Sequence, residues 1–261
     1  PNGLEQGYDK AVSEGLKPKA IISVDLFGLP ARYRLIYEFA KSKNLFLLED
    51  AAQGFGGKIG KQKACTFGNV SATSFFPAKP LGGYGDGGAI FTNNSELAEK
   101  MRSIRAHGGG KDKYDNIRLG LNGRLDTLQA AILIEKLAIF ESELIMRNKI
   151  AKIYSDNLNP NFILPQIPAN YFSSWAQYSI LLKNKKERKK MVEFLRNKEI
   201  RTMVYYQIPL HLQKVFKYLN YKEGDFPQSE SVADKIISIP MHPYLNEIDQ
   251  QFIINKINSF S

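Results

Sequence analysis

A short segment, Ser74-Phe75-Phe76-Pro77-Ala78-Lys79, holds a hydroxyl and a primary amine five positions apart. A neutral lysine amine can attack a carbonyl carbon and form a Schiff base. A turn between Ser74 and Lys79 would direct both side chains at one phosphate-bearing cofactor. The same lysine is also consistent with a loop residue that is exposed after a buried aromatic strand, and the segment alone leaves both interpretations open.

Two acids, Glu49 and Asp50, open the segment Glu49-Asp50-Ala51-Ala52-Gln53. We expect them at the end of a buried strand, and ligands of open α/β sheets bind beyond the carboxyl ends of the strands. A carboxylate held there is a candidate ligand contact. The alternative is that the acid only caps the next stretch of backbone, which is common where strands end.

A glycine-rich stretch follows the lysine, and Gly83, Gly85 and Gly88 have the spacing G-x-G-x-x-G of dinucleotide-binding loops. That fingerprint must follow a strand and open a helix. Here the glycines lead into Ala89-Ile90-Phe91-Thr92, which is typical of a strand, so we reject the dinucleotide interpretation. The glycines more simply let the backbone turn tightly beside Lys79.

The apolar patterns around these motifs predict an open α/β sheet. A β-branched run at 19–26 predicts a buried strand, which Gly28 and Pro30 end before a helix with one apolar face. A second apolar run at 45–48 completes a β-α-β unit, whose strands are parallel. Further strands are expected at 70–76 and 89–92, and helices at 96–106 and 124–157.

The sequence pattern changes near residue 160, where Pro160, Pro165 and Pro168 indicate a linker. Beyond it we expect a smaller α+β domain. Its predicted strands lie at 177–182 and 202–206, and its predicted helices at 186–197 and 247–258. The expected domains are therefore 1–145 and 146–261.

The composition argues against several classes of protein. The formal net charge is +10, but the basic residues are scattered rather than clustered as nucleic-acid binding requires, so we expect no nucleic-acid partner. The apolar runs are too short to span a membrane, and no secretory signal pattern is visible. Cys65 is the only cysteine, which fits a reducing cytoplasm. His107, His211 and His242 are not at metal-ligand spacing, so we expect no metal.

Four segments together, at 49–53, 74–79, 83–94 and 121–133, resemble one family in their order and spacing. They are similar to the nucleotide-sugar aminotransferases of the DegT/DnrJ/StrS family, and the resemblance continues through 206–213 and 239–243. It implies an α/β fold, that of the fold-type I enzymes of pyridoxal phosphate (PLP). The expected architecture is an incomplete large parallel-sheet domain followed by a smaller α+β C-terminal domain.

Family members carry a further N-terminal segment, which supplies a phosphate-binding turn and an aromatic residue that stacks on PLP. Neither feature is found in the 261 residues. We therefore expect that this N-terminal part is absent, and that the 261 residues on their own fold poorly or bind PLP weakly because apolar parts of the sheet are uncovered.

The resemblance implies cofactor contacts at four positions. Lys79 would bind PLP as a Schiff base and then move protons, and Asp50 would keep the pyridine nitrogen protonated. Gln53 would lie near the phenolic oxygen of PLP, and Ser74 would bind its phosphate. Some relatives carry a histidine in place of the lysine and act as dehydratases, and Lys79 argues against that variant.

The resemblance also implies a homodimer with shared active sites. Asn122 would reach the phosphate of the PLP in the neighbouring subunit, and Arg124 would contribute to the sugar end of the same site. Tyr206 and His211 would contact the substrate. An apolar helix after Arg124 suits the dimer interface.

The implied reaction transfers an amino group from glutamate to a keto carbon of a nucleotide sugar, in the cytoplasm, for bacterial surface glycans such as lipopolysaccharide. The substrate expected first is UDP-2-acetamido-2-deoxy-3-oxo-glucuronate. One alternative is a nucleotide sugar with a 4-keto group. The other is a non-catalytic, truncated relative that acts as a partner subunit.

Overall fold

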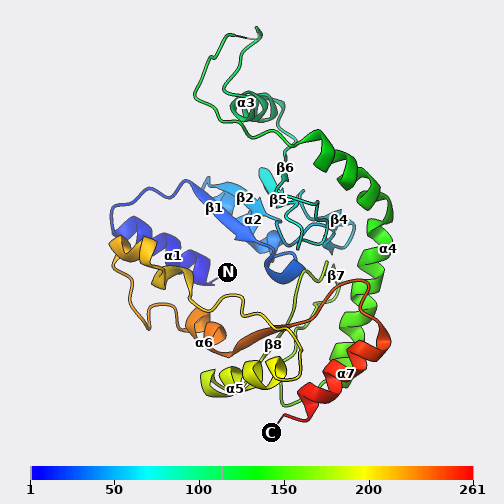
Figure 1. Ribbon diagram of the computed structural model, residues 1–261. Coiled ribbons are helices and arrows are strands. Elements are labelled where there is room, and N and C mark those ends of the chain that lie inside the picture. Colours follow the sequence, from blue (N-terminus) through cyan, green and yellow to red (C-terminus); the bar gives the residue numbers. More distant parts are fainter. Residues whose placement is uncertain (1, 113, 261) are drawn as a thin grey trace. The chain divides into compact units, whose positions relative to one another are not determined.

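The computed structural model describes residues 2–112 and 114–260 of the chain (Figure 1). The chain forms two compact units, which are described separately below. The first comprises Pro1–Ser142 and Ile167–Ser174, and the second comprises Glu143–Gln166 and Trp175–Ser261. In the part of the chain that is described, no helix is both long enough and apolar enough to cross a membrane.

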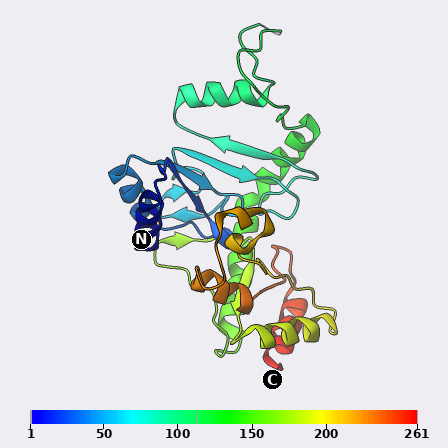
Figure 2. The same ribbon diagram turned by 90° about the vertical axis from the view of Figure 1, so that its left-hand side faces the viewer.

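The first unit is built on a four-stranded sheet with the order β1-β2-β5-β6 (Figure 2). The strands are β1 (Ala20–Val24), β2 (Phe46–Asp50), β5 (Val70–Ser74) and β6 (Gly88–Phe91). β1, β2 and β5 are parallel, which confirms the parallel arrangement predicted for the β-α-β unit. β6 is antiparallel to β5 because the glycine-rich loop returns the chain directly alongside it, without a crossover helix.

The helices of the first unit are α1 (Asn2–Ser13), α2 (Tyr33–Ser42), α3 (Ser95–Arg105) and the N-terminal part of α4 (Thr127–Asn157). α2 crosses between β1 and β2 and buries Tyr33 and Ala40 against Leu47 of β2. The ring of Tyr33 stacks on Phe67, with 4.4 Å between the ring centroids. α3 begins after Asn94, whose Oδ1 accepts a hydrogen bond from the backbone N–H of Leu97 at 3.0 Å, as its cap pattern predicts.

A small antiparallel sheet joins the first unit to a segment far along the chain. Its strands are β4 (Gln62–Lys63), β3 (Lys58–Ile59) and β7 (Tyr171–Phe172), in that order. β7 comes from the proline-rich stretch that the sequence pattern marks as a linker. The segment Ile167–Ser174 therefore packs as part of the first unit.

The second unit contains a two-stranded antiparallel sheet of β8 (Tyr178–Leu181) and β9 (Ile236–Ile239). Its helices are the C-terminal part of α4, α5 (Lys185–Arg196), α6 (Pro227–Lys235) and α7 (Glu247–Asn258), with 3₁₀ turns η2 (Leu210–Leu212) and η3 (Lys214–Leu219). The core is apolar and close to fully buried. Its members include Tyr154, Tyr178, Ile180, Met191, Ile237 and Ile257.

The strand predicted at 202–206 is wrong. Only Met203 pairs there, in an isolated bridge with Ser238 in which each backbone N–H donates to the carbonyl of the other residue. The residues around it have the composition of a strand but no neighbouring strand continues the ladder, so tertiary context overrides propensity. The strand that does pair with β8 is β9, whose four residues are all buried and show no alternation.

Candidate active site

The carboxyl ends of three parallel strands meet at one edge of the large sheet. Val24, Asp50 and Ala72 lie side by side in the register of β1, β2 and β5. The chain leaves this edge into Asp25 after β1, into Ala51 after β2, and through Ser74 towards Lys79 after β5. Such an edge is where ligands of open α/β sheets bind.

The carboxylate of Asp50 is half-buried at this edge. Its Oδ1 accepts a hydrogen bond from the backbone N–H of Ala52 at 3.0 Å, which orients the group. Within the described residues no cation pairs with it. The free lone pairs of this carboxylate can therefore accept a hydrogen bond from a cationic ligand.

The neighbouring acid, Glu49, has a different role because it is fully buried and hydrogen-bonded on both oxygens. It accepts hydrogen bonds from the backbone N–H groups of Cys65, Phe67 and Gly68 and from the Ser71 hydroxyl, at 2.5 to 3.3 Å. These bonds fix the 65–68 turn against β2. Of the two acids in the motif, only Asp50 is available to a ligand.

Gln53 is buried below the same edge, with 6% of its surface exposed. Its Oε1 accepts a hydrogen bond from the backbone N–H of Phe27 at 2.6 Å, and its backbone carbonyl accepts one from the Ser174 hydroxyl at 2.7 Å. The turn after β1 and the segment around β7 thus hold Gln53 from two sides.

The loop from β5 to β6 presents Ser74 and Lys79. Ser74 Oγ accepts a hydrogen bond from the N–H of Phe76 at 3.2 Å, and the backbone N–H of Lys79 donates to the Phe76 carbonyl at 2.9 Å, which closes a turn. The side chain of Lys79 is half-buried and forms no ion pair with any described residue. A Cβ at Gly82 would lie 2.5 Å from the Pro77 carbonyl oxygen, so the glycine is required for this close turn.

Gln129 of α4 is a residue that the sequence pattern did not single out. Its Oε1 accepts a hydrogen bond from the backbone N–H of Tyr84 at 2.8 Å, and a Cβ at Gly83 would lie 2.8 Å from the same oxygen. The glycine loop is therefore attached to the beginning of α4. In the sequence, Gln129 is marked only by its position in the segment 121–133, which resembles the family.

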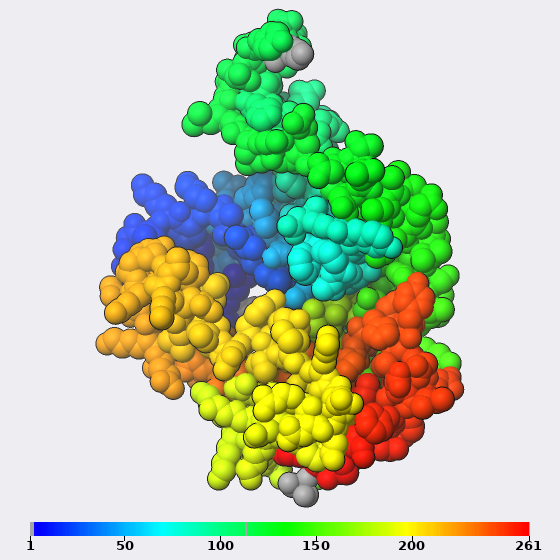
Figure 3. Space-filling model, viewed as in Figure 1, coloured from blue at the N-terminus to red at the C-terminus, as the bar shows by residue number. Residues whose placement is uncertain are grey.

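Asn122 and Arg124 lie together just before α4. Nε of Arg124 donates to Oδ1 of Asn122 at 3.2 Å, and Asn122 forms an isolated bridge with Ala106. Both side chains are exposed. The stretch from α3 to α4 also exposes apolar side chains, with Leu119 97% and Tyr114 86% accessible, and Figure 3 shows this stretch at the surface in green.

Tyr206 and His211 belong to the second unit, so the structure does not group them with the residues of the sheet edge. Nε2 of His211 lies 2.9 Å from Oε1 of Glu230, and the imidazole packs on the ring of Phe226. The histidine side chain is only 8% exposed. These contacts favour a structural role for His211, whereas Tyr206 is 55% exposed.

Asp25 is the second residue that sequence reasoning missed, although it follows β1 as Ala51 follows β2. It is fully buried, and its Oδ1 accepts hydrogen bonds from the Tyr33 hydroxyl at 2.7 Å and the Ala31 N–H at 3.0 Å. Its Oδ2 has no hydrogen-bond partner among the described residues. Burial, and to a smaller extent the charges of Glu49 and Asp50, raise the pKa of Asp25 to about 7, against hydrogen bonds that lower it.

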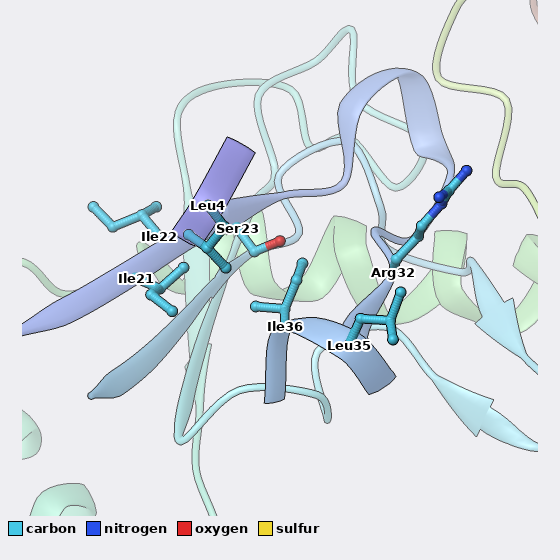
Figure 4. A pocket seen from close by; sticks show the side chains of 7 residues that line it. All are labelled: Leu4, Ile21, Ile22, Ser23, Arg32, Leu35 and Ile36. Carbon is cyan, nitrogen blue, oxygen red and sulfur yellow. The ribbon is translucent and has the colours of Figure 1, made fainter. Parts of the chain in front are cut away.

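Two cavities in the first unit contain none of the predicted site residues. One, of about 330 Å³, is lined by apolar side chains of α1, β1 and α2 such as Leu4, Ile21 and Ile36 (Figure 4). The other, of about 780 Å³, lies between β5, β6 and α3 and includes Arg102 and Arg105 in its lining. The candidate site is thus defined by the strand ends and their loops rather than by either cavity.

A family model described as the DegT/DnrJ/EryC1/StrS aminotransferase family matches residues 9–258. The chain is 42% identical over 256 residues to the "Pleiotropic regulatory protein" of Geobacillus stearothermophilus, covering 97% of this chain and 67% of that protein. It is 42% identical over 231 residues to the UDP-2-acetamido-2-deoxy-3-oxo-D-glucuronate aminotransferase of Pseudomonas aeruginosa, covering 88% of this chain and 62% of that enzyme. A solved DegT DnrJ EryC1 StrS aminotransferase from Brucella abortus is similar with a TM-score of 0.93 at 50% identity, covering 98% of this chain and 68% of that one.

The chain therefore spans 67% and 62% of the lengths of these two curated relatives. The fold expected from the resemblance is confirmed, since the sheet and the C-terminal unit are those of PLP-dependent sugar aminotransferases. The family match likewise confirms the resemblance that the four motifs carry. The chain belongs to the DegT/DnrJ/EryC1/StrS aminotransferase family.

Proposed function

We propose that this chain forms the site of a PLP-dependent transaminase that moves an amino group from glutamate to a keto carbon of a nucleotide-linked sugar. The observation that carries the proposal is that Asp50 and the loop that carries Lys79 follow neighbouring parallel strands at one sheet edge. Asp50 offers a carboxylate with no cationic partner among the described residues, and Lys79 follows the neighbouring strand with no ion-pair partner there.

The donor set at this edge fits PLP. When bound, PLP supplies an electron sink for the negative charge that forms on the carbon next to the transferred nitrogen. Asp50 would hold the proton on the pyridine nitrogen through a charge-assisted hydrogen bond. Ser74 would donate to the phosphate, and Gln53 would lie at the phenolic oxygen. Nζ of Lys79 would bind the cofactor and then carry the proton that transamination moves.

The other half of the site would come from a second copy of the chain in a homodimer. Asn122 and Arg124 are exposed, adjacent and joined by a hydrogen bond, in a stretch that also exposes Leu119 and Tyr114. Apolar surface of this kind is typical of a protein interface. Arg124 would present a permanently charged, planar group to an anionic part of the nucleotide sugar.

The substrate that we propose is a UDP-linked 3-keto sugar, with UDP-2-acetamido-2-deoxy-3-oxo-glucuronate as the first candidate. It is supported by the Pseudomonas aeruginosa relative, which is named for this substrate. The reaction would take place in the cytoplasm and supply an amino sugar for surface glycans such as lipopolysaccharide. A 4-keto nucleotide sugar is the direct competitor.

The proposal is tested by loading the protein with PLP, adding glutamate, and then offering matched 3-keto and 4-keto nucleotide sugars. Mass spectrometry of the sugar product is expected to show exchange of the keto oxygen for an amino group with the 3-keto substrate. Amination of only the 4-keto sugar would overturn the substrate proposal. Absence of both PLP binding and amination would support the alternative of a non-catalytic partner subunit.

A further inference from the structure

The carboxyl group of Asp25 lies in an environment that disfavours its charge. Asp25 is fully buried at the end of β1, and its backbone N–H donates to the carbonyl of Asp50 at 3.0 Å. The ionisable groups that face it are Tyr33 of α2, Glu49 and Asp50 of β2, and Cys65 of the turn that Glu49 holds. None of these is a cation, so a charged Asp25 would add a further anion to this edge.

The second oxygen of this carboxyl group is packed rather than hydrogen-bonded. Oδ2 has no hydrogen-bond partner among the described residues, and a Cβ at Gly54 would lie 2.4 Å from it. The side chain of Asp25 is therefore packed closely against Gly54, directly after Gln53. A buried carboxylate without a partner for one oxygen is far more costly than a neutral acid in the same place.

The turn that Asp25 begins is the one that holds Gln53. Oδ1 of Asp25 accepts from the Ala31 N–H and so closes the turn from its far end. Within the turn Phe27 has a left-handed backbone, with φ of 60°, and its N–H donates to Oε1 of Gln53 at 2.6 Å. Gly28 accepts a hydrogen bond from the N–H of Ser174 at 2.9 Å, and the Ser174 hydroxyl reaches the Gln53 carbonyl.

We propose that Asp25 is a positioning residue of the cofactor site, and that its neutral carboxyl group sets the orientation of the Gln53 amide. The acid acts on Gln53 through two neighbours. One is the turn that Asp25 begins, whose Phe27 N–H donates to Gln53, and the other is the backbone of Gly54, directly after Gln53. Ionisation of Asp25 would place a third negative charge beside Glu49 and Asp50. It would also move the turn that Asp25 begins away from Gly54. This inference rests on the proposed function for its effect on PLP, but the protonation of Asp25 itself does not depend on it.

The first test uses the protein without PLP, so that it stands apart from the proposed function. Asp25→Asn keeps the shape and the acceptor oxygen but cannot ionise. Thermal unfolding of the wild type and of Asp25→Asn is measured from pH 5 to pH 9. We expect the midpoint of the wild type to fall relative to Asp25→Asn from pH 5 to about pH 7, where only the unfolded acid is ionised, and the difference to level off at higher pH. A difference in unfolding midpoint that stays constant from pH 5 to pH 9 would overturn the inference that Asp25 is neutral.

The second test measures PLP affinity from the visible absorbance of the bound cofactor over the same pH range. Above about pH 7, where Asp25 ionises, the ratio of the wild-type dissociation constant for PLP to that of Asp25→Asn is expected to rise, at most about tenfold per pH unit. Asp25→Ala removes the acceptor for Ala31 and is expected to weaken PLP binding at every pH. Equal PLP affinity of Asp25→Ala and the wild type, with both folded, would overturn the positioning role.

Tyr33→Phe is the matched control, since its hydroxyl donates to Asp25 and lowers the pKa of that acid. The pH at which the difference in unfolding temperature between the Asp25 and Asp25→Asn proteins levels off should therefore move upward in a Tyr33→Phe background. An unchanged levelling-off pH would contradict the assignment of the titration to Asp25. If no variant and no wild type binds PLP, the proposed function fails, while the unfolding test still decides the state of Asp25.

Discussion

Asp50 lies opposite Ala72 in the parallel register of β2 and β5, so its carboxylate occupies the sheet edge from which the chain continues through Ser74 to Lys79. The acid and the amine are far apart in sequence, and the register brings the segments that carry them together. In a parallel sheet all three neighbouring strands end at the same edge, and this is why one short loop can complete a site that begins on another strand.

Replacing Asp50 by asparagine is expected to keep the fold and remove most of the turnover. The amide cannot keep the pyridine nitrogen protonated, so the electron sink weakens, by about 100-fold in rate or about 2.7 kcal/mol of barrier. The measurement is the single-turnover rate with glutamate. Asp86→Asn, an exposed acid in the glycine loop, is the control and should be close to wild type. Near-normal turnover of Asp50→Asn would refute the assignment.

Glu49→Gln is expected to lower the stability of the fold and keep most of the turnover, which is the opposite of the result expected for Asp50→Asn. Glu49→Gln removes an acceptor from a buried group that four donors contact, so the free energy of unfolding should fall by about 1–3 kcal/mol. The fraction of molecules that remain folded should keep most of their turnover. Urea unfolding followed by circular dichroism measures the first quantity. A variant as stable as wild type but catalytically inactive would contradict the structural role of Glu49.

Gly54→Ala tests the contact between Gly54 and Asp25, because it adds a methyl group at the place where the two residues touch. The added methyl group would lie 2.4 Å from Asp25 Oδ2, so either the acid or the Gln53 segment must move, at a cost of about 1–3 kcal/mol. Gly7→Ala in α1 is the matched control, because nothing lies within 4 Å of that site and alanine favours a helix. The prediction fails if both variants unfold at the same urea concentration as wild type.

Arg124→Ala is expected to raise the Michaelis constant of the nucleotide sugar about tenfold and to affect the half-reaction with glutamate much less. The reason is that a planar guanidinium suits an anionic group of the sugar nucleotide, which glutamate lacks at that position. Arg34→Ala serves as the control because the Arg34 side chain is 91% exposed and, among the described residues, its ion-pair partner is Glu38 on its own helix. Equal losses in both half-reactions would count against a role specific to the sugar.

The sequence predicts the frame of this site well, and particular residues show why. β-branched and apolar runs place β1, β2 and β5, and the family motifs predict the roles of Asp50 and Lys79, which stay predictions. The pattern at 202–206 fails because strand composition does not guarantee a partner strand, and only Met203 pairs. β9 was missed because four consecutive buried residues show no period of two.

The contacts that fix the site residues depend on long-range geometry that no local pattern encodes. Asp25 and Gln53 are 28 positions apart, and the hydrogen bond from Phe27 to Gln53 appears only when β1 and β2 are aligned. Ser174 reaches the same place from beyond α4. The different roles of Glu49 and Asp50 follow from which face of β2 each side chain occupies, since neighbours on a strand point to opposite faces.

The most direct test of the account is to identify the lysine that binds PLP. The protein is incubated with PLP and reduced with borohydride, and the digested peptides are mapped by mass spectrometry. The account predicts a pyridoxyl group on Lys79 and none on Lys63, an exposed lysine on β4. Lys79→Arg should remove the labelled peptide and leave the rest of the map unchanged. A pyridoxyl group on a different lysine, with Lys79 unmodified, would contradict the central claim.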